Sequence, residues 1–263
     1  MCFLEKVEIG SKISDCRRYH RLLKLNSYKG NGNRVYSQTS RQKLNGVMVI
    51  RMNEAIILAG GEGWRLKPET WTPKPLLKIN KETLLDKQIS WLKTRGFQNI
   101  IVASDKDGLT TLDVEYSVET NKLGTGGATK RAFQKIKGNI AYVMNVDDLV
   151  FYNPKELFDY AGKGAAVLLA KPILPFGKVT LQNDRNVIRF ERNPTLEFYV
   201  SAGHHVFKRK IVERHFPDEG DFEFSTMQIL ADKRILLGYV YDGMWLTINT
   251  MKDLIRAKTF FGK

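Results

Sequence analysis

A short segment near residue 60 combines glycines with two cations. It contains Gly60, Gly61, Gly63, Arg65 and Lys74, and Lys74 stands between two prolines. Glycine lets the backbone approach a ligand closely and direct several N–H groups toward it. The guanidinium and the ammonium would add full positive charges on the same side. These residue types at this spacing suit a triphosphate or a pyrophosphate, and an ordinary structural turn is the alternative.

Two further segments carry polar groups suited to ligands. Asp147 and Asp148 end the apolar run 140–146, and Glu119 opens a second glycine-rich run, 119–128. Groups at the carboxyl ends of strands lie where α/β sheets bind ligands. Carboxylate oxygens are hard ligands that suit Mg²⁺, and a helix cap or a turn is the alternative role for the two aspartates.

The hydrophobic pattern predicts the elements that would position these groups. Residues 55–59 and 99–103 have the composition of buried strands, and 83–95 between them has apolar residues at helical spacing. A strand, a helix and a strand in this order predict a parallel crossover. Further strands are predicted at 114–118, 140–149, 165–170, 176–181, 186–190, 199–207 and 235–241.

The segment 54–77 resembles the signature of the sugar-1-phosphate nucleotidyltransferases, roughly L-A-G-G-x-G-T-R-L-x-P-x-T-x-x-x-P-K-P-L. Nearly every fixed position matches, with Trp64 in place of the usual Thr. Further motifs follow in the family's order as far as residue 258. The resemblance implies an α/β fold with a Rossmann-like, mixed and mostly parallel sheet flanked by helices. It also implies a small sugar-binding β lobe and a short form without the β-helix extension of many relatives.

The resemblance also assigns the nucleotide half of a site. Arg65 and Lys74 would be the catalytic cations, and Glu119 and Gly124 match an element that contacts the base and ribose. Because uracil, thymine and guanine each offer an N–H group to a carboxylate, Glu119 does not choose among them. The triphosphate would lie against the end of the first strand and the glycine turn, at Leu58, Ala59, Gly60, Gly61 and Gly63.

The sugar-phosphate half departs more from the family. Gly177 matches a glycine that lies against the sugar, and Gly203 stands in a strand element whose usual Asn is replaced. The Lys of the family's E-K-P falls on Asn193, but a slip of one residue gives Glu191 and Arg192 instead. We expect Arg192 to be the substitute cation, because a guanidinium binds phosphate in a bidentate manner.

The metal position is a further departure. By the resemblance Asp147 binds Mg²⁺, whereas the family's second metal carboxylate falls on Thr247, which carries no charge. Asn249 replaces a glycine of the same motif and could supply an amide oxygen. The loss of one negative ligand predicts weaker Mg²⁺ binding, although nucleotide phosphates also hold the metal.

The implied reaction joins an NTP and a sugar 1-phosphate to give NDP-sugar and pyrophosphate by in-line attack on the α-phosphorus. Mg²⁺ on Asp147 would bridge the α-phosphate and the incoming phosphate, while Arg65 would stabilise the leaving pyrophosphate. Lys74 would hold the two reacting phosphates together. No general base is required, because a phosphate monoester is already ionised near pH 7. The sequence identifies neither the nucleotide nor the sugar.

Composition argues against a membrane protein and a secreted, disulfide-rich protein. The chain of 263 residues is 43% hydrophobic and has no apolar run approaching the ~18 residues of a membrane helix. Its first residues lack the pattern of a secretory signal. Two cysteines, Cys2 and Cys16, do not indicate a disulfide framework, so a cytoplasmic location is expected.

The net charge of +14 is unevenly distributed. Residues 1–51 contribute +8, from eleven Lys/Arg and three Asp/Glu, and residues 52–263 contribute the other +6. We expect residues 1–51 to be a basic, disordered extension, with Met52 as an alternative start, and 52–263 to form a single nucleotidyltransferase domain. The excess over 52–263 suits polyanionic substrates and argues against a nucleic-acid partner. A homo-oligomer is left open.

Two other functions remain open at this point. Trp64, Asn193 and Thr247 also fit a catalytically impaired paralogue that binds nucleotide sugar and regulates a partner. The second alternative is a cytidylyltransferase that acts on a non-sugar phosphate such as phosphocholine.

Overall fold

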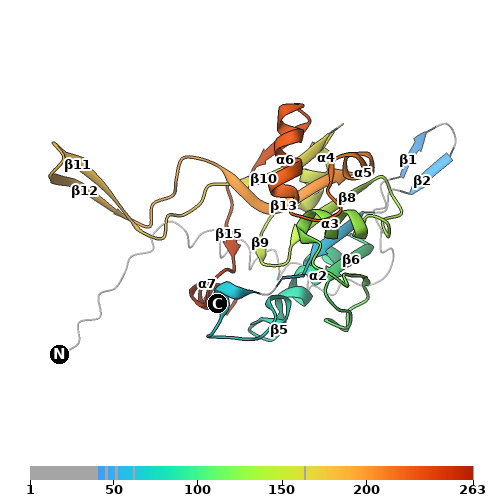
Figure 1. The fold of residues 1–263 in the computed structure, drawn as a ribbon, viewed down its shortest axis with the longest axis horizontal. Coiled ribbons are helices and arrows are strands. Elements are labelled where there is room, and N and C mark those ends of the chain that lie inside the picture. The colour runs from blue at the N-terminus through green and yellow to red at the C-terminus, as the bar shows by residue number, and fades with distance from the viewer. Residues whose placement is uncertain (1–40, 45–46, 51–52, 62, 163, 263) are drawn as a thin grey trace, which may run out of the picture. The chain divides into compact units, whose positions relative to one another are not determined.

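A seven-stranded sheet forms the centre of the fold (Figure 1). The computed structural model describes residues 41–44, 47–50, 53–61, 63–162 and 164–262. The strand order is β14-β10-β13-β8-β3-β6-β7. The strands are β3 (Glu54–Leu58), β6 (Asn99–Ser104), β7 (Glu115–Val118), β8 (Ile140–Asn145), β10 (Ala165–Ala170), β13 (Val200–Lys208) and β14 (Leu236–Val240).

The sheet is mixed and mostly parallel, as predicted. β3 is parallel to both β6 and β8, β6 is parallel to β7, and β10 is parallel to β14. Only β13 runs against its neighbours, β8 and β10. The carboxyl ends of β3, β6, β7 and β8 therefore meet at one edge of the sheet, where a ligand site is expected.

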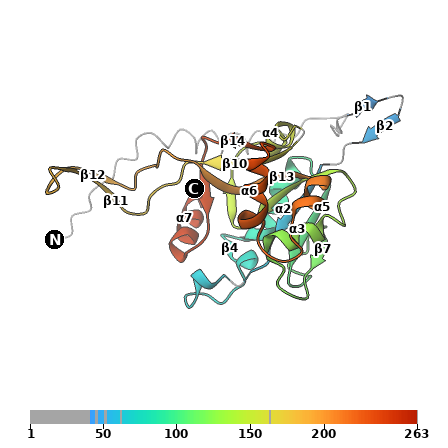
Figure 2. The same ribbon diagram turned by 45° about the horizontal axis from the view of Figure 1, so that its top comes forward.

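Helices cover both faces of the sheet (Figure 2). One core contains α2 (Leu84–Thr94), α4 (Pro154–Tyr160) and α7 (Met251–Phe261), and the other contains α3 (Gly124–Ala132), α5 (Arg209–His215) and α6 (Phe222–Asp232). Because strand side chains alternate, β3 contributes Ala55 and Ile57 to the first core and Ile56 and Leu58 to the second. Its continuous apolar run is thus explained by burial on both faces.

Local signals begin the helices that support the site. The Thr83 hydroxyl accepts a hydrogen bond from the Asp86 amide at 3.0 Å, which caps α2. Thr250 and Asp253 form a reciprocal capping box at the start of α7. This box fixes the backbone directly after Asn249. Two 3₁₀ helices, η1 (Trp64–Leu66) and η2 (Lys74–Leu76), follow the glycine turn.

Four two-stranded sheets complete the fold. β9 (Asp148–Val150) pairs with β15 (Trp245–Thr247), and β4 (Lys78–Ile79) pairs with β5 (Glu82–Thr83). β11 (Gly177–Gln182) and β12 (Asn186–Arg192) form a hairpin over the strands predicted at 176–181 and 186–190, whereas the strands predicted at 165–170 and 199–207 belong to the central sheet. β1 (Arg41–Leu44) and β2 (Val47–Ile50) lie within the predicted N-terminal extension, whose residues 1–40 fall outside the described part of the chain.

The link between the strands predicted at 99–103 and 114–118 is short. No helix occurs in residues 105–114, between β6 and β7, and this stretch is described throughout. Among the described helices, none is both long enough and apolar enough to cross a membrane.

Candidate active site

A cavity of about 660 Å³ opens at the carboxyl end of β3. The glycine turn contributes Gly60 and Gly61 to its wall, and Gly61 has a φ of 101°, which favours glycine. Every predicted nucleotide-binding residue except Gly63 lines this cavity. They are Leu58, Ala59, Gly60, Gly61, Glu119 and Gly124. The structure therefore brings the two glycine-rich segments together around one space.

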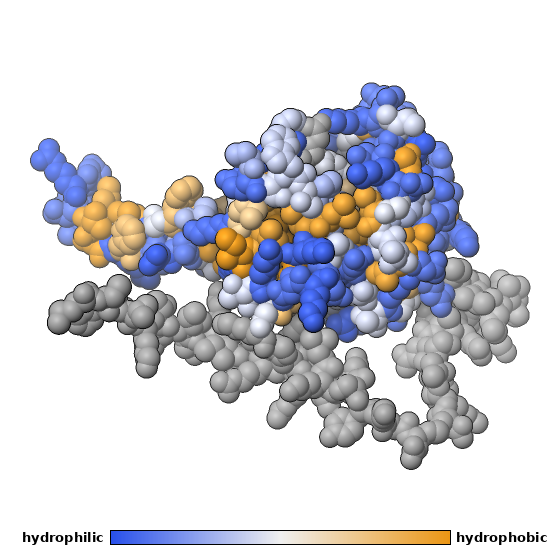
Figure 3. All heavy atoms as spheres, turned by 90° about the horizontal axis from the view of Figure 1, so that it is seen from below, coloured by the Kyte–Doolittle hydropathy of each residue, from blue (hydrophilic) through white to orange (hydrophobic). Residues whose placement is uncertain are grey.

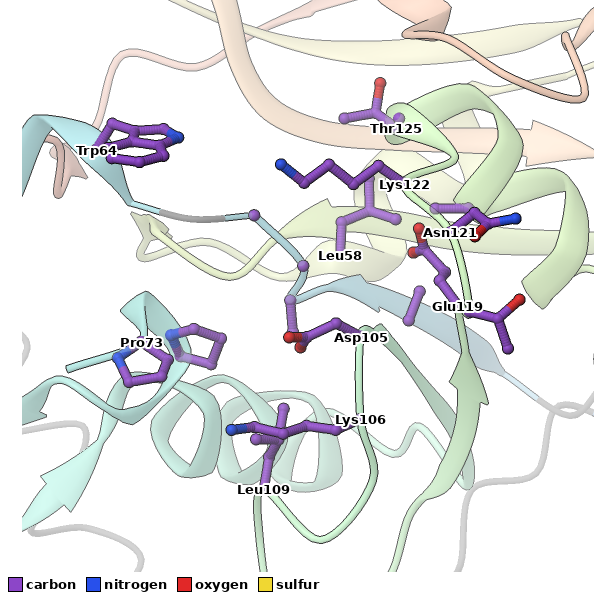
Figure 4. Close-up of a pocket in the computed structure, with 18 of the residues that line it drawn as sticks. Leu58, Trp64, Pro73, Asp105, Lys106, Leu109, Glu119, Asn121, Lys122 and Thr125 are labelled. Atoms are coloured by element: carbon purple, nitrogen blue, oxygen red, sulfur yellow. The ribbon is translucent and has the colours of Figure 1, made fainter. Parts of the chain in front are cut away.

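Glu119 enters the cavity from the end of β7, and Trp64 stands on the opposite side (Figure 4). The Glu119 Oε2 atom accepts a hydrogen bond from the Leu123 amide at 3.2 Å, which fixes the direction of the carboxylate. Partial burial raises the pKa of Glu119 above its usual value, against the lowering effect of that hydrogen bond. The Oε1 atom faces Gly60: a Cβ at that position would lie 3.9 Å from it.

Two glycines of the second segment serve packing. Gly126 and Gly127 lie inside the first turns of α3, and both amides point at the Gly220 carbonyl, at 2.9 and 3.4 Å. A Cβ at either position would collide with the backbone of the 217–220 loop. Only Gly124, with a φ of 69°, also lines the cavity. The sequence predicts this stretch as a ligand loop. The structure shows that two of its glycines, Gly126 and Gly127, are needed for α3 to pack against the loop at 217–220.

The predicted cations meet the predicted metal carboxylate beside this cavity. The Lys74 Nζ atom lies 2.7 Å from Asp147 Oδ2, and both side chains are mostly buried. The amide oxygen of Asn249 accepts hydrogen bonds from Lys74 Nζ and from Arg65 Nη1, each at 3.4 Å. Three segments far apart in the sequence therefore converge: η1 with η2, the turn after β8, and the residues after β15.

Backbone hydrogen bonds hold these segments in place. The Val146 amide donates to the Leu58 carbonyl at 3.1 Å, which joins the turn that carries Asp147 to the end of β3. The Ile248 amide donates to the Asp147 carbonyl at 3.0 Å, which joins the same turn to the residues after β15. The glycine turn, Asp147 and Asn249 are thereby fixed at one edge of the sheet.

Asp148 lies beside this group, and its carboxyl group is held by uncharged donors. Its carboxylate accepts hydrogen bonds from Trp245 Nε1 at 2.9 Å and from Asn145 Nδ2 at 3.1 Å. Burial, and then the charge of Asp147, raise the pKa of Asp148 to about 7. Thr247 pairs with Asp148 across β15 and β9 and also hydrogen-bonds to its carboxyl group, so a carboxyl group does stand next to the uncharged Thr247.

Gly203 has a different reason to be glycine from the one that the resemblance implies. Its φ is 74°, and a Cβ there would collide with the Asp148 carboxylate. The close approach that needs glycine in this structure is to Asp148. Contact of Gly203 with a sugar stays a prediction.

The three remaining sugar-phosphate residues lie on the β11–β12 hairpin. Gly177 pairs with Arg192, and the Phe190 ring covers the place where a Gly177 side chain would be. Glu191 Oε1 lies 3.0 Å from Arg189 Nε. Among the described residues, no hydrogen bond or ion pair links Gly177, Glu191 or Arg192 to the Lys74–Asp147 pair. Their role in binding a sugar phosphate stays a prediction.

Comparison with known proteins decides the family. The family described as "Nucleotidyl transferase" matches residues 54–263, which is most of the chain. The chain belongs to the nucleotidyl transferase family. It is similar to the mannose-1-phosphate guanyltransferase of Kluyveromyces lactis, with 27% identity over 237 residues that cover 79% of this chain and 64% of that protein. The chain thus spans less than two thirds of the length of that relative.

A shorter relative is matched over nearly its whole length. The D-glycero-alpha-D-manno-heptose 1-phosphate guanylyltransferase of Aneurinibacillus thermoaerophilus is 27% identical over 225 residues, which cover 78% of this chain and 96% of that protein. Among solved structures, HddC from Yersinia pseudotuberculosis complexed with GMP-PN has a TM-score of 0.63 and 23% identity. The match covers 80% of this chain and 100% of that one. This likeness confirms the fold of a nucleotidyl transferase.

A buried polar network supports the turn that carries Asp147 in this nucleotidyl transferase. Gln88 Nε2 donates to the carbonyls on either side of Asp147, at 3.2 Å for Val146 and 2.7 Å for Asp148. His204 Nε2 donates to the same Asp148 carbonyl at 2.9 Å. Burial lowers the pKa of His204 to about 4, so its ring is neutral and its Nδ1 atom accepts from Tyr142.

The sequence pattern indicates that Gln88 is buried, but it does not identify the hydrogen-bond partners of its side-chain amide. Gln88 lies on the apolar side of the helix predicted over 83–95, and a buried amide must find hydrogen-bond partners. The partners are the carbonyls of Val146, in the turn after β8, and of Asp148, the first residue of β9, and only the fold identifies them.

Gln88→Leu is expected to lower the free energy of unfolding by about 1–3 kcal/mol, because the Val146 carbonyl loses its buried donor. Chemical denaturation measures this change. Gln134→Leu, on an exposed position, is the matched control and should change stability by about 0.5 kcal/mol or less. Equal effects of the two substitutions would contradict a supporting role for Gln88.

Proposed function

We propose that this chain transfers a nucleotidyl group from an NTP to a sugar 1-phosphate, giving NDP-sugar and pyrophosphate. The observation that carries the proposal is the meeting of Lys74, Arg65 and Asp147 around Asn249, beside a glycine-lined cavity. The names of the relatives from Kluyveromyces lactis and Aneurinibacillus thermoaerophilus, both sugar-phosphate guanylyltransferases, support this class of reaction.

The residues around Asp147 also fit a divalent metal. Asp147 supplies a carboxylate, Thr247 a hydroxyl and Asn249 an amide oxygen, all hard donors. Mg²⁺ commonly binds through one or two carboxylates together with substrate phosphates, so a site with one aspartate suits a metal that arrives with the triphosphate. We propose Asp147 as its principal protein ligand. When bound, Mg²⁺ would neutralise phosphate charge and polarise the α-phosphate.

The chain's own residues account for the remaining chemistry. The glycine turn would direct backbone N–H groups at the triphosphate, and Glu119 would orient the base at the far end of the cavity. Lys74 would hold the α-phosphate close to the incoming phosphate monoester, and Arg65 would stabilise the charge that develops on pyrophosphate. The nucleophile needs no base, because it is already ionised near pH 7. Catalysis then consists of positioning and charge neutralisation.

We further propose guanine as the base. The two relatives named above are guanylyltransferases, and guanine presents a ring N–H and an amino group on one edge. The Glu119 carboxylate can accept both, because each carboxylate oxygen has two acceptor sites and only one site is used by the Leu123 amide.

A substrate panel tests the proposed function. GTP, ATP, UTP, CTP and dTTP are each combined with mannose, glucose and heptose 1-phosphates and with phosphocholine, and pyrophosphate release and product mass are measured. GTP with a hexose or heptose 1-phosphate is expected to give the highest rate. No turnover across the panel, together with measurable binding of GDP-sugar, would instead support a regulatory paralogue. A CDP-choline product would support a cytidylyltransferase.

A further inference from the structure

Two exposed tryptophans line the cavity beside the glycine turn. Trp64 and Trp71 expose 67% and 72% of their surface, whereas the chain's other two tryptophans are partly buried. Figure 3 shows hydrophobic residues gathered on the β11–β12 hairpin, but these two rings border a cavity with charged residues in its wall. Tryptophan is mostly buried in folded proteins, so two exposed rings at one cavity indicate a role in binding.

The side chain of Lys67 lies over both rings and also lines the cavity. Its Nζ atom is 3.7 Å from the centre of the Trp64 ring and 5.0 Å from the centre of the Trp71 ring. An ammonium this close to an indole is attracted to the face of the ring. Among the described residues, no carboxylate lies within ion-pair distance of Lys67. Because indoles carry no charge, the rings orient the ammonium and leave its positive charge available to a ligand.

The backbone that carries these three side chains is held in place. Leu66, next to Lys67, is 1% exposed and anchors η1 in the core. The Lys67 amide donates to the Trp64 carbonyl at 3.1 Å, and the Thr70 amide donates to the Leu66 carbonyl at 3.1 Å. These hydrogen bonds turn the chain so that Trp71 meets the same ammonium as Trp64. A lysine that is already oriented loses less side-chain freedom when it binds an anion.

The charges in the cavity wall are unevenly placed. The loops after β6 and β7 contribute two acids and two lysines, which balance: Asp105, Glu119, Lys106 and Lys122. Asp221, the remaining acid of the described lining, accepts a hydrogen bond from the Thr125 amide at 2.9 Å. The segment 64–75 contributes Lys67 and, among its described residues, no acid to the lining. A ligand with a neutral base and a polyanionic end is therefore favoured with its anionic end toward Lys67.

We propose that Lys67, held between the rings of Trp64 and Trp71, binds the terminal phosphate of the nucleoside triphosphate and so selects a triphosphate over a diphosphate. Figure 4 places Trp64 across the cavity from Glu119, the proposed contact of the base. The phosphates would follow the glycine turn between them, and the terminal phosphate is the group farthest from the base. A charge-assisted contact with an ammonium suits that phosphate. The proposal rests on the proposed function, because it takes the ligand to be a nucleotide.

Calorimetric titration of the full chain with GTP, GDP and GMP tests the proposal, with Mg²⁺ present and sugar 1-phosphate absent so that no turnover occurs. If the substrate panel selects another base, the nucleotides of that base are used. Lys67→Met should weaken GTP binding about tenfold or more relative to GDP binding, and Lys67→Arg should restore the preference. Binding of GMP, which needs no contact with Lys67, reports that each variant keeps its fold and its site. Lys106→Met removes the same charge from another part of the cavity wall and should change GTP and GDP binding by the same factor.

The part played by the rings has a test of its own. Trp64→Leu/Trp71→Leu keeps Lys67 but removes both indoles, and it should lower the preference for GTP over GDP about threefold, whereas Trp64→Phe/Trp71→Phe should keep most of it.

Several results would overturn the proposal. It fails if Lys67→Met keeps the preference for GTP, if Lys106→Met lowers the preference as much, or if the leucine variant leaves it unchanged. A wild type that binds GTP and GDP equally would also overturn it, while pyrophosphate release in the substrate panel would still uphold the proposed function. A wild type that binds none of the nucleotides would overturn both.

Discussion

Asp147→Asn is expected to lower kcat for NDP-sugar formation at least about a hundredfold, with the fold preserved. Asp147 is the carboxylate that contacts Lys74, at 2.7 Å, and the same Lys74 ammonium donates to the Asn249 amide oxygen. An amide of the same shape keeps one acceptor oxygen but removes the negative charge. Steady-state rates with GTP and the sugar 1-phosphate found in the substrate panel measure the loss.

Two further substitutions serve as controls for Asp147→Asn. Asp113→Asn removes one negative charge from an exposed position and should leave kcat unchanged. Asp148→Asn replaces the neighbouring carboxyl group, which is buried and accepts hydrogen bonds from Trp245 and Asn145. If Asp148→Asn abolishes activity while Asp147→Asn keeps it, the assignment of the principal metal ligand to Asp147 is wrong. Titration of Mn²⁺ into each variant gives a readout that does not depend on turnover.

The sequence predicts that the glycine turn stands at the end of a buried strand, and the reason is local. An apolar run buried on both faces, a glycine turn and two cations all lie within 54–77, so their order along the chain already indicates their arrangement. The structure brings Leu58, Gly60, Gly61 and Trp64 to the lining of one cavity. The place of Asp147 at the same edge of the sheet is also predictable, because it follows a strand that pairs with β3; its role as a metal ligand stays a prediction.

What the sequence cannot predict depends on contacts between distant segments. The clash that requires glycine at 126 and 127 comes from the loop at 217–220, and the clash at Gly203 comes from Asp148. Nothing near these glycines in the sequence separates packing from ligand binding. The same limit applies to Asn249, whose oxygen faces Arg65 and Lys74 only because β15 pairs with β9.

Lys74→Met is expected to lower kcat by about a hundredfold or more. Methionine keeps most of the length and apolar contact of the lysine stem, so the change removes the ammonium alone. The proposed role of that ammonium is to hold two anionic phosphates together, which is needed most in the transition state. We therefore expect the loss in kcat to exceed the rise in KM, and initial rates over a range of both substrates measure the two separately.

The same pair allows a stronger test through a double-mutant cycle. Without ligand, Lys74 neutralises Asp147, and Asn249 accepts a hydrogen bond from the same ammonium. If the two residues act as one unit on the reacting phosphates, Asp147→Asn/Lys74→Met should be no slower than the slower single variant by more than about tenfold. Losses that multiply would mean that each residue acts alone, and the contact between them would then be a feature of the unliganded state. The cycle measures the coupling between Lys74 and Asp147 apart from the effect of each single substitution. It therefore separates the pairing of the two residues from the contacts that each makes with substrate.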